Sequence, residues 1–218
     1  MVSKCSLPAE PGESGDLASE SSDPWNNAGT GHSALAELNY TPEKNGRIDV
    51  SKAMTINEKF QLSRQFWSYQ VEHGVLKEPR AFINPCPHVS FAQGEDQIKY
   101  LRKRYDALSG NHMFPNMQFT DDRDEFADKL PLMAQGRDFD AEPVAISWTD
   151  AGTDINYGSL TKQFVDAAKA NGTKVRYGHE VVNLKREGNF WKVTVKNVHT
   201  GDKQVVRARF VFVGAGGY

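Results

Sequence analysis

A glycine-containing loop around residue 30 places the strongest constraint on this chain. Residues 23–34 read DPWNNAGTGHSA, and residues 33–38, SALAEL, favour a helix. Glycines at 29 and 31 let the backbone approach a ligand closely. Polar side chains at the start of a helix lie near free backbone N–H groups, which attract electron-rich atoms. The pattern predicts either a ligand-binding loop or a glycine-rich turn with an ordinary helix cap.

Composition excludes several classes of protein. The 218 residues suffice for one or two domains, and 26 basic against 28 acidic residues leave a net charge of −2, which gives no electrostatic reason to expect nucleic acid binding. No apolar run approaches the roughly 20 residues of a membrane span, and the first residues lack the apolar centre of a signal peptide. Two cysteines, Cys5 and Cys86, are too few for a disulfide framework or a metal site. Composition alone therefore indicates a soluble cytosolic protein.

Hydrophobic spacing predicts four helices. The first covers residues 51–73, with Ile56, Phe60, Trp67 and Val71 on one face and Gly74 as its C-terminal cap. The others are expected around residues 98–108, after residues 121–122, and over 159–170.

Strands are expected in two regions. Residues 80–91 read as a strand region kinked or placed at an edge by two prolines. Alternating residues predict strands at 174–177, 180–185, 190–196 and 203–207, and residues 209–213 read as a buried parallel strand.

Several blocks together resemble one flavoprotein family. They are residues 20–42 (ESSDPWNNAGTGHSALAELNYTP), Phe66-Trp67 with VEHGVL at 71–76, FIN at 82–84, PHVSF at 87–91, GED at 94–96, GTDINYG at 152–158 and FVFVGAGG at 210–217. In type and order these blocks are similar to those of the FAD-dependent malate:quinone oxidoreductases. The resemblance implies an α/β (α+β) fold, namely an incomplete glutathione-reductase-like FAD-binding domain with part of an inserted substrate domain.

The resemblance also implies a division of the chain. Residues 1–19 are expected to be an irregular, disordered tail. Residues 20–75 would be the flavin-contacting loop and helices of the FAD domain, residues 76–150 part of the substrate domain, and residues 151–218 the second part of the FAD domain. The Gly-x-Gly-x-x-Gly turn that such a domain uses for the pyrophosphate of FAD does not occur in the sequence. We therefore expect an internal fragment that binds FAD poorly by itself.

The function implied by the resemblance is oxidation of (S)-malate to oxaloacetate, with electrons passing through FAD to a membrane quinone. A quinone acceptor implies a peripheral position on the inner face of the bacterial cell membrane. Two alternatives remain open: a related FAD-dependent 2-hydroxy acid oxidase, acting for instance on 2-hydroxyglutarate, and a non-enzymatic remnant.

Candidate site residues follow from this chemistry. His32 is the leading candidate for the base that takes the hydroxyl proton, with a flavin contact or a helix cap as the alternative. His88 is a second candidate, with a half-exposed strand histidine as the alternative. Arg80 is a candidate clamp for a substrate carboxylate, with a solvated charge at a strand end as the alternative. Asn39 and Tyr40 suit either the pocket or the core. The expected cofactor contacts are Asn26, Asn27, Ala28, Gly29, Thr30, Gly31, Ser33, Val182, Gly214, Ala215 and Gly216.

Overall fold

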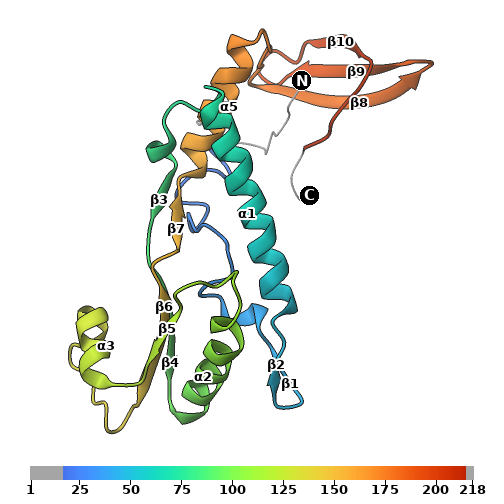
Figure 1. Cartoon of the computed structure of the whole chain (residues 1–218). Coiled ribbons are helices and arrows are strands. Elements are labelled where there is room, and N and C mark those ends of the chain that lie inside the picture. The colour runs from blue at the N-terminus through green and yellow to red at the C-terminus, as the bar shows by residue number, and fades with distance from the viewer. Residues whose placement is uncertain (1–16, 215–218) are drawn as a thin grey trace. The chain divides into compact units, whose positions relative to one another are not determined.

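The computed structural model describes residues 17–214, which form two compact units (Figure 1). The larger unit comprises residues 28–156. The smaller unit combines residues 17–27 with residues 157–214. The predicted division into FAD-domain and substrate-domain segments stays a prediction.

An antiparallel sheet with strand order β4-β6-β5 organises one part of the larger unit. Its strands are β4 (His88–Gln93), β5 (Gln118–Thr120) and β6 (Val144–Thr149), and every residue of β6 is buried. Successive side chains of a strand point to opposite faces. Ala145 accordingly packs with Leu101 of α2 (Glu95–Ser109), whereas Ile146 packs with Phe126 of α3 (Arg123–Lys129). The sheet is therefore covered on both faces, and a short helix α4 (Pro131–Ala134) follows α3.

Three helices of this unit, α1, α2 and α3, agree with the sequence predictions, whereas α4 was not predicted. The longest, α1 (Ser51–Glu72), buries Ala53, Asn57 and Phe60, and it is followed by Gly74 with φ +70°. Asp122 caps α3, accepting hydrogen bonds from the backbone nitrogens of Asp124 and Glu125. Hydrophobic spacing and capping residues were sufficient to predict these three helices.

The predicted strand region at 80–91 forms two strands separated by Cys86 and Pro87. β3 (Ile83–Pro85) pairs antiparallel with β7 (Thr153–Ile155), and β4 follows the break. An isolated bridge between Thr30 and Asp154 attaches the glycine loop to β7. The unit also contains a hairpin of β1 (Glu43–Lys44) and β2 (Arg47–Ile48) and the 3-10 turns η1 (Leu38–Tyr40) and η2 (Pro79–Ala81).

The described part of the smaller unit consists largely of one helix and an antiparallel meander. The helix is α5 (Tyr157–Ala170), and the strands, in spatial order β10-β9-β8, are β8 (His179–Glu187), β9 (Phe190–Asn197) and β10 (Lys203–Ala208). The register shifts between Val181 and Asn183, which marks a bulge in β8. These elements match the helix at 159–170 and three of the predicted strands.

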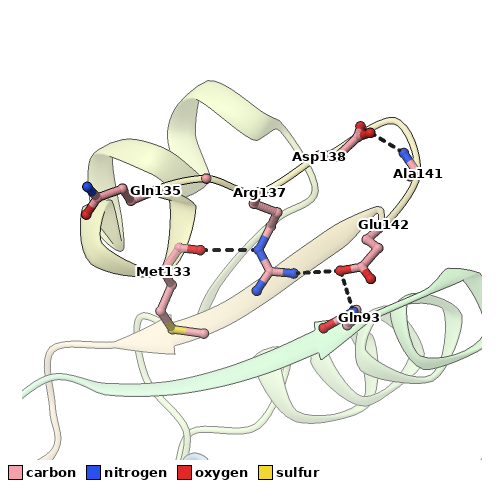
Figure 2. A pocket seen from close by; sticks show the side chains of 8 residues that line it. Gln93, Met133, Gln135, Arg137, Asp138, Ala141 and Glu142 are labelled. Carbon is pink, nitrogen blue, oxygen red and sulfur yellow. Dashed lines mark hydrogen bonds and ion pairs between the residues drawn. The ribbon is translucent and has the colours of Figure 1, made fainter.

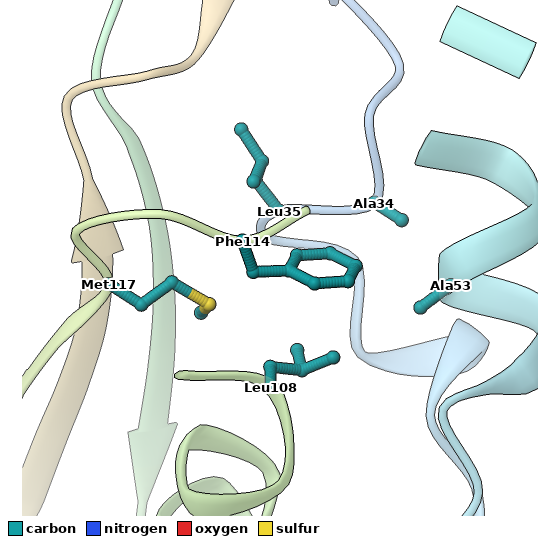
Figure 3. Packing of buried hydrophobic residues seen from close by; sticks show 6 residues of the cluster. All are labelled: Ala34, Leu35, Ala53, Leu108, Phe114 and Met117. Atoms are coloured by element: carbon teal, nitrogen blue, oxygen red, sulfur yellow. The ribbon is translucent and has the colours of Figure 1, made fainter. Parts of the chain in front are cut away.

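The helix predicted over residues 33–38 does not form. Ala34 adopts φ +57°, a left-handed conformation that a helix of L-residues does not continue through. The side chains of Ala34 and Leu35 are buried instead in a cluster with Ala53, Leu108 and Phe114 (Figure 3). Packing of these two residues therefore overrides the helix propensity of the segment.

Two predicted strands are also absent. Residues 174–177 are irregular, and the chain enters β8 through Gly178 with φ +61°. Residues 209–213 are irregular too, and Phe210 and Phe212 are 77% and 66% exposed. A buried parallel strand needs neighbouring strands and covered faces. Within residues 17–214 the sheet of this unit is the three-stranded meander, and neither segment pairs with it.

Candidate active site

His32 lies between a carboxylate and a phenol. Its Nδ1 is 2.8 Å from Oε1 of Glu37, and its Nε2 is 2.6 Å from the hydroxyl of Tyr40. The His32 and Tyr40 rings meet edge to face, and Nζ of Lys52 lies 4.7 Å from the centre of the Tyr40 ring. The sequence predicts His32 as a site residue and allows two locations for Tyr40, the substrate pocket or the core. It gives no indication of Glu37.

This arrangement selects one form of the neutral imidazole. A carboxylate accepts hydrogen bonds only, so Nδ1 carries the proton and Nε2 accepts from the Tyr40 hydroxyl. A carboxylate on Nδ1 fixes the tautomer and stabilises the ring after Nε2 takes up a proton. The His32 side chain is 47% exposed and that of Glu37 is 22% exposed. His32 is therefore an oriented, accessible imidazole, and its role as the base stays a prediction.

The glycine loop is packed tightly against β7. Gly31 donates its N–H to the carbonyl of Thr153 at 2.8 Å, and Ile155 donates to the carbonyl of Gly29 at 2.6 Å. A Cβ atom on Gly31 would overlap the Thr153 side chain and would lie 2.8 Å from the Thr153 carbonyl oxygen. Gly31 is thus needed for close packing with β7. Its predicted role in ligand approach stays a prediction.

The other polar side chains of the loop form hydrogen bonds with the backbone of this chain. Nδ2 of Asn26 donates to the carbonyl of Glu20, and Nδ2 of Asn27 lies within hydrogen-bonding distance of the carbonyls of Ser21 and Asp23. The hydroxyl of buried Ser33 donates to the carbonyl of Gly31 at 3.1 Å. The predicted helix N-terminus is absent here, because residues 33–38 do not form a helix. Ala28 is exposed and Thr30 is half-buried, so both are accessible from solvent.

His88 of β4 packs against Gly152 and Thr153, the residue of β7 that also binds the glycine loop. Its Nε2 donates to the carbonyl of Thr153 at 3.2 Å, the same oxygen that accepts the N–H of Gly31. Its Nδ1 is buried, with no hydrogen-bond partner among the residues that the structure describes. The ring also lies against Gly152, where a Cβ atom would overlap it. His88 is held in the packing between β4 and β7, whereas His32 is accessible.

Arg80 lies on η2, with an exposed side chain, rather than on a strand. Its carbonyl accepts a hydrogen bond from Nδ2 of Asn84 at 3.1 Å. The structure thus provides a solvent-accessible guanidinium at this position.

The remaining predicted contacts belong to the smaller unit or lie beyond the described residues. Val182 is 40% exposed at the bulge of β8, and Gly214 is exposed. Ala215 and Gly216 lie outside the described residues.

Comparison with known proteins decides the family. The sequence model of the malate:quinone oxidoreductase (Mqo) family matches residues 12–218. The chain belongs to this family. It is 72% identical over 201 residues to a probable malate:quinone oxidoreductase of Corynebacterium aurimucosum, and 64% identical over 201 residues to the malate:quinone oxidoreductase of Corynebacterium glutamicum. Each alignment covers 92% of this chain and 40% of the relative, so the chain spans well under half of their length.

Solved structures confirm the predicted α/β (α+β) fold class. Glycine oxidase from Geobacillus kaustophilus matches 94% of this chain and 47% of its own with a TM-score of 0.62 at 16% identity. Glycine oxidase from Bacillus cereus matches 84% of this chain and 43% of its own with a TM-score of 0.54 at 19% identity. At these identities the likeness concerns the fold alone.

A surface cavity of about 420 Å³ in the larger unit of this Mqo-family chain is lined by residues between Gln93 and Glu142 (Figure 2). Arg137 at its rim donates to the carbonyl of Met133 and pairs with Glu142 at 3.5 Å, and Gln93 donates to the same carboxylate at 2.8 Å. Arg137 and Glu142 are thus paired with each other, and Oδ1 of Asp138 accepts hydrogen bonds from the backbone nitrogens of Asp140 and Ala141. None of the predicted catalytic or cofactor-binding residues lines this cavity, so we do not assign it to the active site.

The described residues contain no helix that is both long and apolar enough to cross a membrane. Within the same residues, no group of three or more histidine, cysteine or acidic side chains is placed to hold a metal ion.

Proposed function

We propose that the full-length protein containing this chain oxidises (S)-malate to oxaloacetate and passes the electrons to a membrane quinone. The observation that carries the proposal is the family match over residues 12–218, together with 72% identity to a probable malate:quinone oxidoreductase. The oriented His32 adds a group with the required chemistry.

FAD is the cofactor that this reaction requires. When bound, FAD would supply an acceptor for the C2 hydrogen of malate with its electron pair, and a carrier of those electrons to the quinone. Ala28, Gly29 and Thr30 suit a planar ring system, because they carry a small side chain or none, are exposed or half-buried, and shortly precede His32 in the sequence. We propose these three residues as contacts of the flavin ring. Because residues 33–38 do not form a helix, this loop offers no helix N-terminus to the cofactor.

His32 supplies the acid–base part of the reaction in this proposal. Oxidation of an alcohol releases the hydroxyl proton as well as the C2 hydrogen, so the site needs a proton acceptor. Nε2 of His32 takes up this proton, either directly or through the Tyr40 hydroxyl that is bonded to it. Glu37 on Nδ1 stabilises the charged ring that results.

The proposed quinone acceptor places the full-length protein at the membrane. Quinones of respiratory chains are lipid-soluble, so their reduction requires an approach to the bilayer. We propose peripheral attachment on the inner face of the bacterial membrane.

The function is tested in a full-length graft, in which residues 17–214 of this chain replace the matching segment of the C. aurimucosum relative. We expect malate-dependent reduction of a quinone analogue. 2-Hydroxyglutarate is longer than malate by one methylene group, and such a difference in a fitted pocket changes kcat/KM by about 10–200-fold. A higher kcat/KM for 2-hydroxyglutarate than for malate would identify 2-hydroxyglutarate as the substrate. Turnover of neither substrate, in a folded graft that retains FAD, would contradict the enzyme proposal.

Arg80 provides a test of the substrate pocket. We propose that its exposed guanidinium binds a malate carboxylate through two parallel hydrogen bonds. In the full-length graft, Arg80→Lys keeps the charge but removes the planar fork, and should lower kcat/KM for malate about tenfold. The control is Arg64→Lys, which alters an exposed arginine of α1. If Arg80→Lys and Arg64→Lys have the same unchanged kinetics, Arg80 is not part of the pocket.

A further inference from the structure

Arg104 of α2 is fully buried, and four uncharged oxygen atoms accept its hydrogen bonds. Nη2 lies 3.2 Å from the carbonyl of Ala34 and 3.0 Å from that of Leu35. Nε donates to Oγ1 of Thr41 at 3.1 Å, and Nη1 lies 3.5 Å from Oγ of Ser90. A single side chain thus binds both ends of the segment 34–41, which contains Glu37 and Tyr40.

Neighbouring side chains bind the rest of this segment. The hydroxyl of Tyr100, one helical turn before Arg104, lies 2.8 Å from the carbonyls of both Leu38 and Thr41. The hydroxyl of Ser90 donates to the carbonyl of Ala36 at 2.8 Å. Side chains take the place of the backbone hydrogen bonds that a helix would have made.

The shape of the segment determines how His32 and Glu37 meet. Ala34 has φ +57°, which is unfavourable for a residue other than glycine. This left-handed residue turns the chain so that Glu37, five positions after His32, reaches Nδ1. The N–H of Ala36 lies 3.3 Å from the second carboxylate oxygen of Glu37. Figure 3 shows the side chains of Ala34 and Leu35 in the core cluster, and Arg104 binds the carbonyls of the same two residues.

Retention of a charge at this position is unfavourable for stability. Burial lowers the pKa of Arg104 from its usual value, and the nearby Tyr100 and Glu37 act in the opposite direction. A buried charge that forms no direct ion pair with a carboxylate is often less stable than an apolar side chain of similar volume. An apolar residue, however, could not bind the carbonyls of Ala34 and Leu35. The guanidinium is therefore explained by the backbone shape that it fixes.

We propose that Arg104 is a positioning residue, which holds the left-handed turn at Ala34 so that the Glu37 carboxylate remains on Nδ1 of His32. Its importance for turnover rests on the proposed function, in which His32 is the base. The effect of Arg104 on the tautomer of the His32 ring is independent of the proposed function.

The first test measures the His32 ring itself. The full-length graft is labelled with ¹⁵N in its histidine rings and observed by NMR. The signals of His32 are those that disappear in the His32→Gln variant. We expect them to show the Nδ1–H tautomer. Arg104→Lys replaces the planar guanidinium by a single ammonium, which cannot bind the Ala34 and Leu35 carbonyls in the same way. We therefore expect this variant to show some of the Nε2–H tautomer at His32. Arg102→Lys is the matched control, because Arg102 lies on the same helix, half-exposed, and pairs with Asp121. A folded Arg104→Lys protein with only the Nδ1–H tautomer would overturn the proposal.

A milder variant covers the case in which Arg104→Lys does not fold. Thr41→Val removes the acceptor of Nε and preserves the shape of a buried side chain. It should shift the tautomer in the same direction by a smaller amount. An unchanged tautomer in folded Thr41→Val would then overturn the proposal.

The second test measures turnover in a double-mutant cycle. Arg104→Lys should lower kcat per bound flavin roughly ten- to a hundredfold with little change in KM, because a small misplacement of the base has effects of this size. In a His32→Gln background the same change should lower kcat no further, since Arg104 acts through His32. An additional loss of the same size in that background would show a separate role and overturn the proposal. Should His32→Gln leave kcat unchanged, the proposed base fails, while the tautomer result still decides the role of Arg104.

Discussion

Replacement of His32 by glutamine in the full-length graft is expected to lower kcat for malate by about 10²–10⁴-fold, the usual contribution of a positioned general base. The expectation follows from the geometry of the ring. Nδ1 is bonded to Glu37 and Nε2 to Tyr40, so the imidazole is held with its lone pair directed at a proton-bearing oxygen. Glutamine is of similar length but has no nitrogen that can take up a proton near neutral pH.

The measurement is steady-state turnover of malate with a quinone analogue, divided by the amount of bound flavin. His73→Gln is the control, because His73 is an exposed histidine that bonds the carbonyl of Tyr69 at the end of α1. It should leave turnover unchanged. If His32→Gln lowers flavin occupancy while the rate per bound flavin stays the same, His32 contacts the cofactor and is not the base.

Elements governed by local signals could be predicted from the sequence. Gly74 and Gly110 follow the helices α1 and α2, and Asp122 precedes α3 as its cap. The helix α5 and the three strands of the meander likewise follow from periodicity and turn residues. In each case the residues that form or terminate an element lie within a few positions of it.

The candidate site depends on contacts between distant residues, which a single sequence does not reveal. The bonds from Arg104 to Ala34 and Leu35 join residues 70 and 69 positions apart. Periodicity places Arg104 on α2 but does not show that its side chain points inward. Glu37 was missed for a related reason, because the helix expected at 33–38 would not have brought its carboxylate back to His32. A left-handed alanine has no sequence signature of its own.

Packing explains the errors at strands as well. Residues 209–213 have the composition of a buried strand, yet Val213 is 65% exposed. Apolar residues in a short run show that a segment can be buried, whereas its neighbours determine whether it is. The same distinction applies to Gly31. Glycine at this position predicts the close approach of another group, and in the structure Thr153 comes that close, while the predicted contact of Gly31 with a ligand stays a prediction.

Gly31→Ala is expected to destabilise this chain by about 3 kcal/mol, at the upper end of the range for overpacking a buried site. The added methyl group would overlap the Thr153 side chain and would lie 2.8 Å from both Cζ of Phe60 and the Thr153 carbonyl. That carbonyl cannot move away easily, because it accepts hydrogen bonds from both Gly31 and His88. The loss should be measured by urea unfolding followed by tryptophan fluorescence.

Two companion variants separate this clash from a general effect of replacing glycine. Gly110 has φ −79°, and apart from its chain neighbours and the backbone of α2, none of the described residues comes within 4 Å of the place that a methyl group on it would take. Gly110→Ala should therefore change the free energy of unfolding by no more than about 0.5 kcal/mol. Thr153→Ala removes Oγ1, the atom closest to the added methyl group. In the Gly31→Ala background it should therefore restore part of the lost stability, whereas alone it should not stabilise the chain. Equal losses for Gly31→Ala and Gly110→Ala, or no recovery with Thr153→Ala, would show that contact with β7 is not the reason for glycine at position 31.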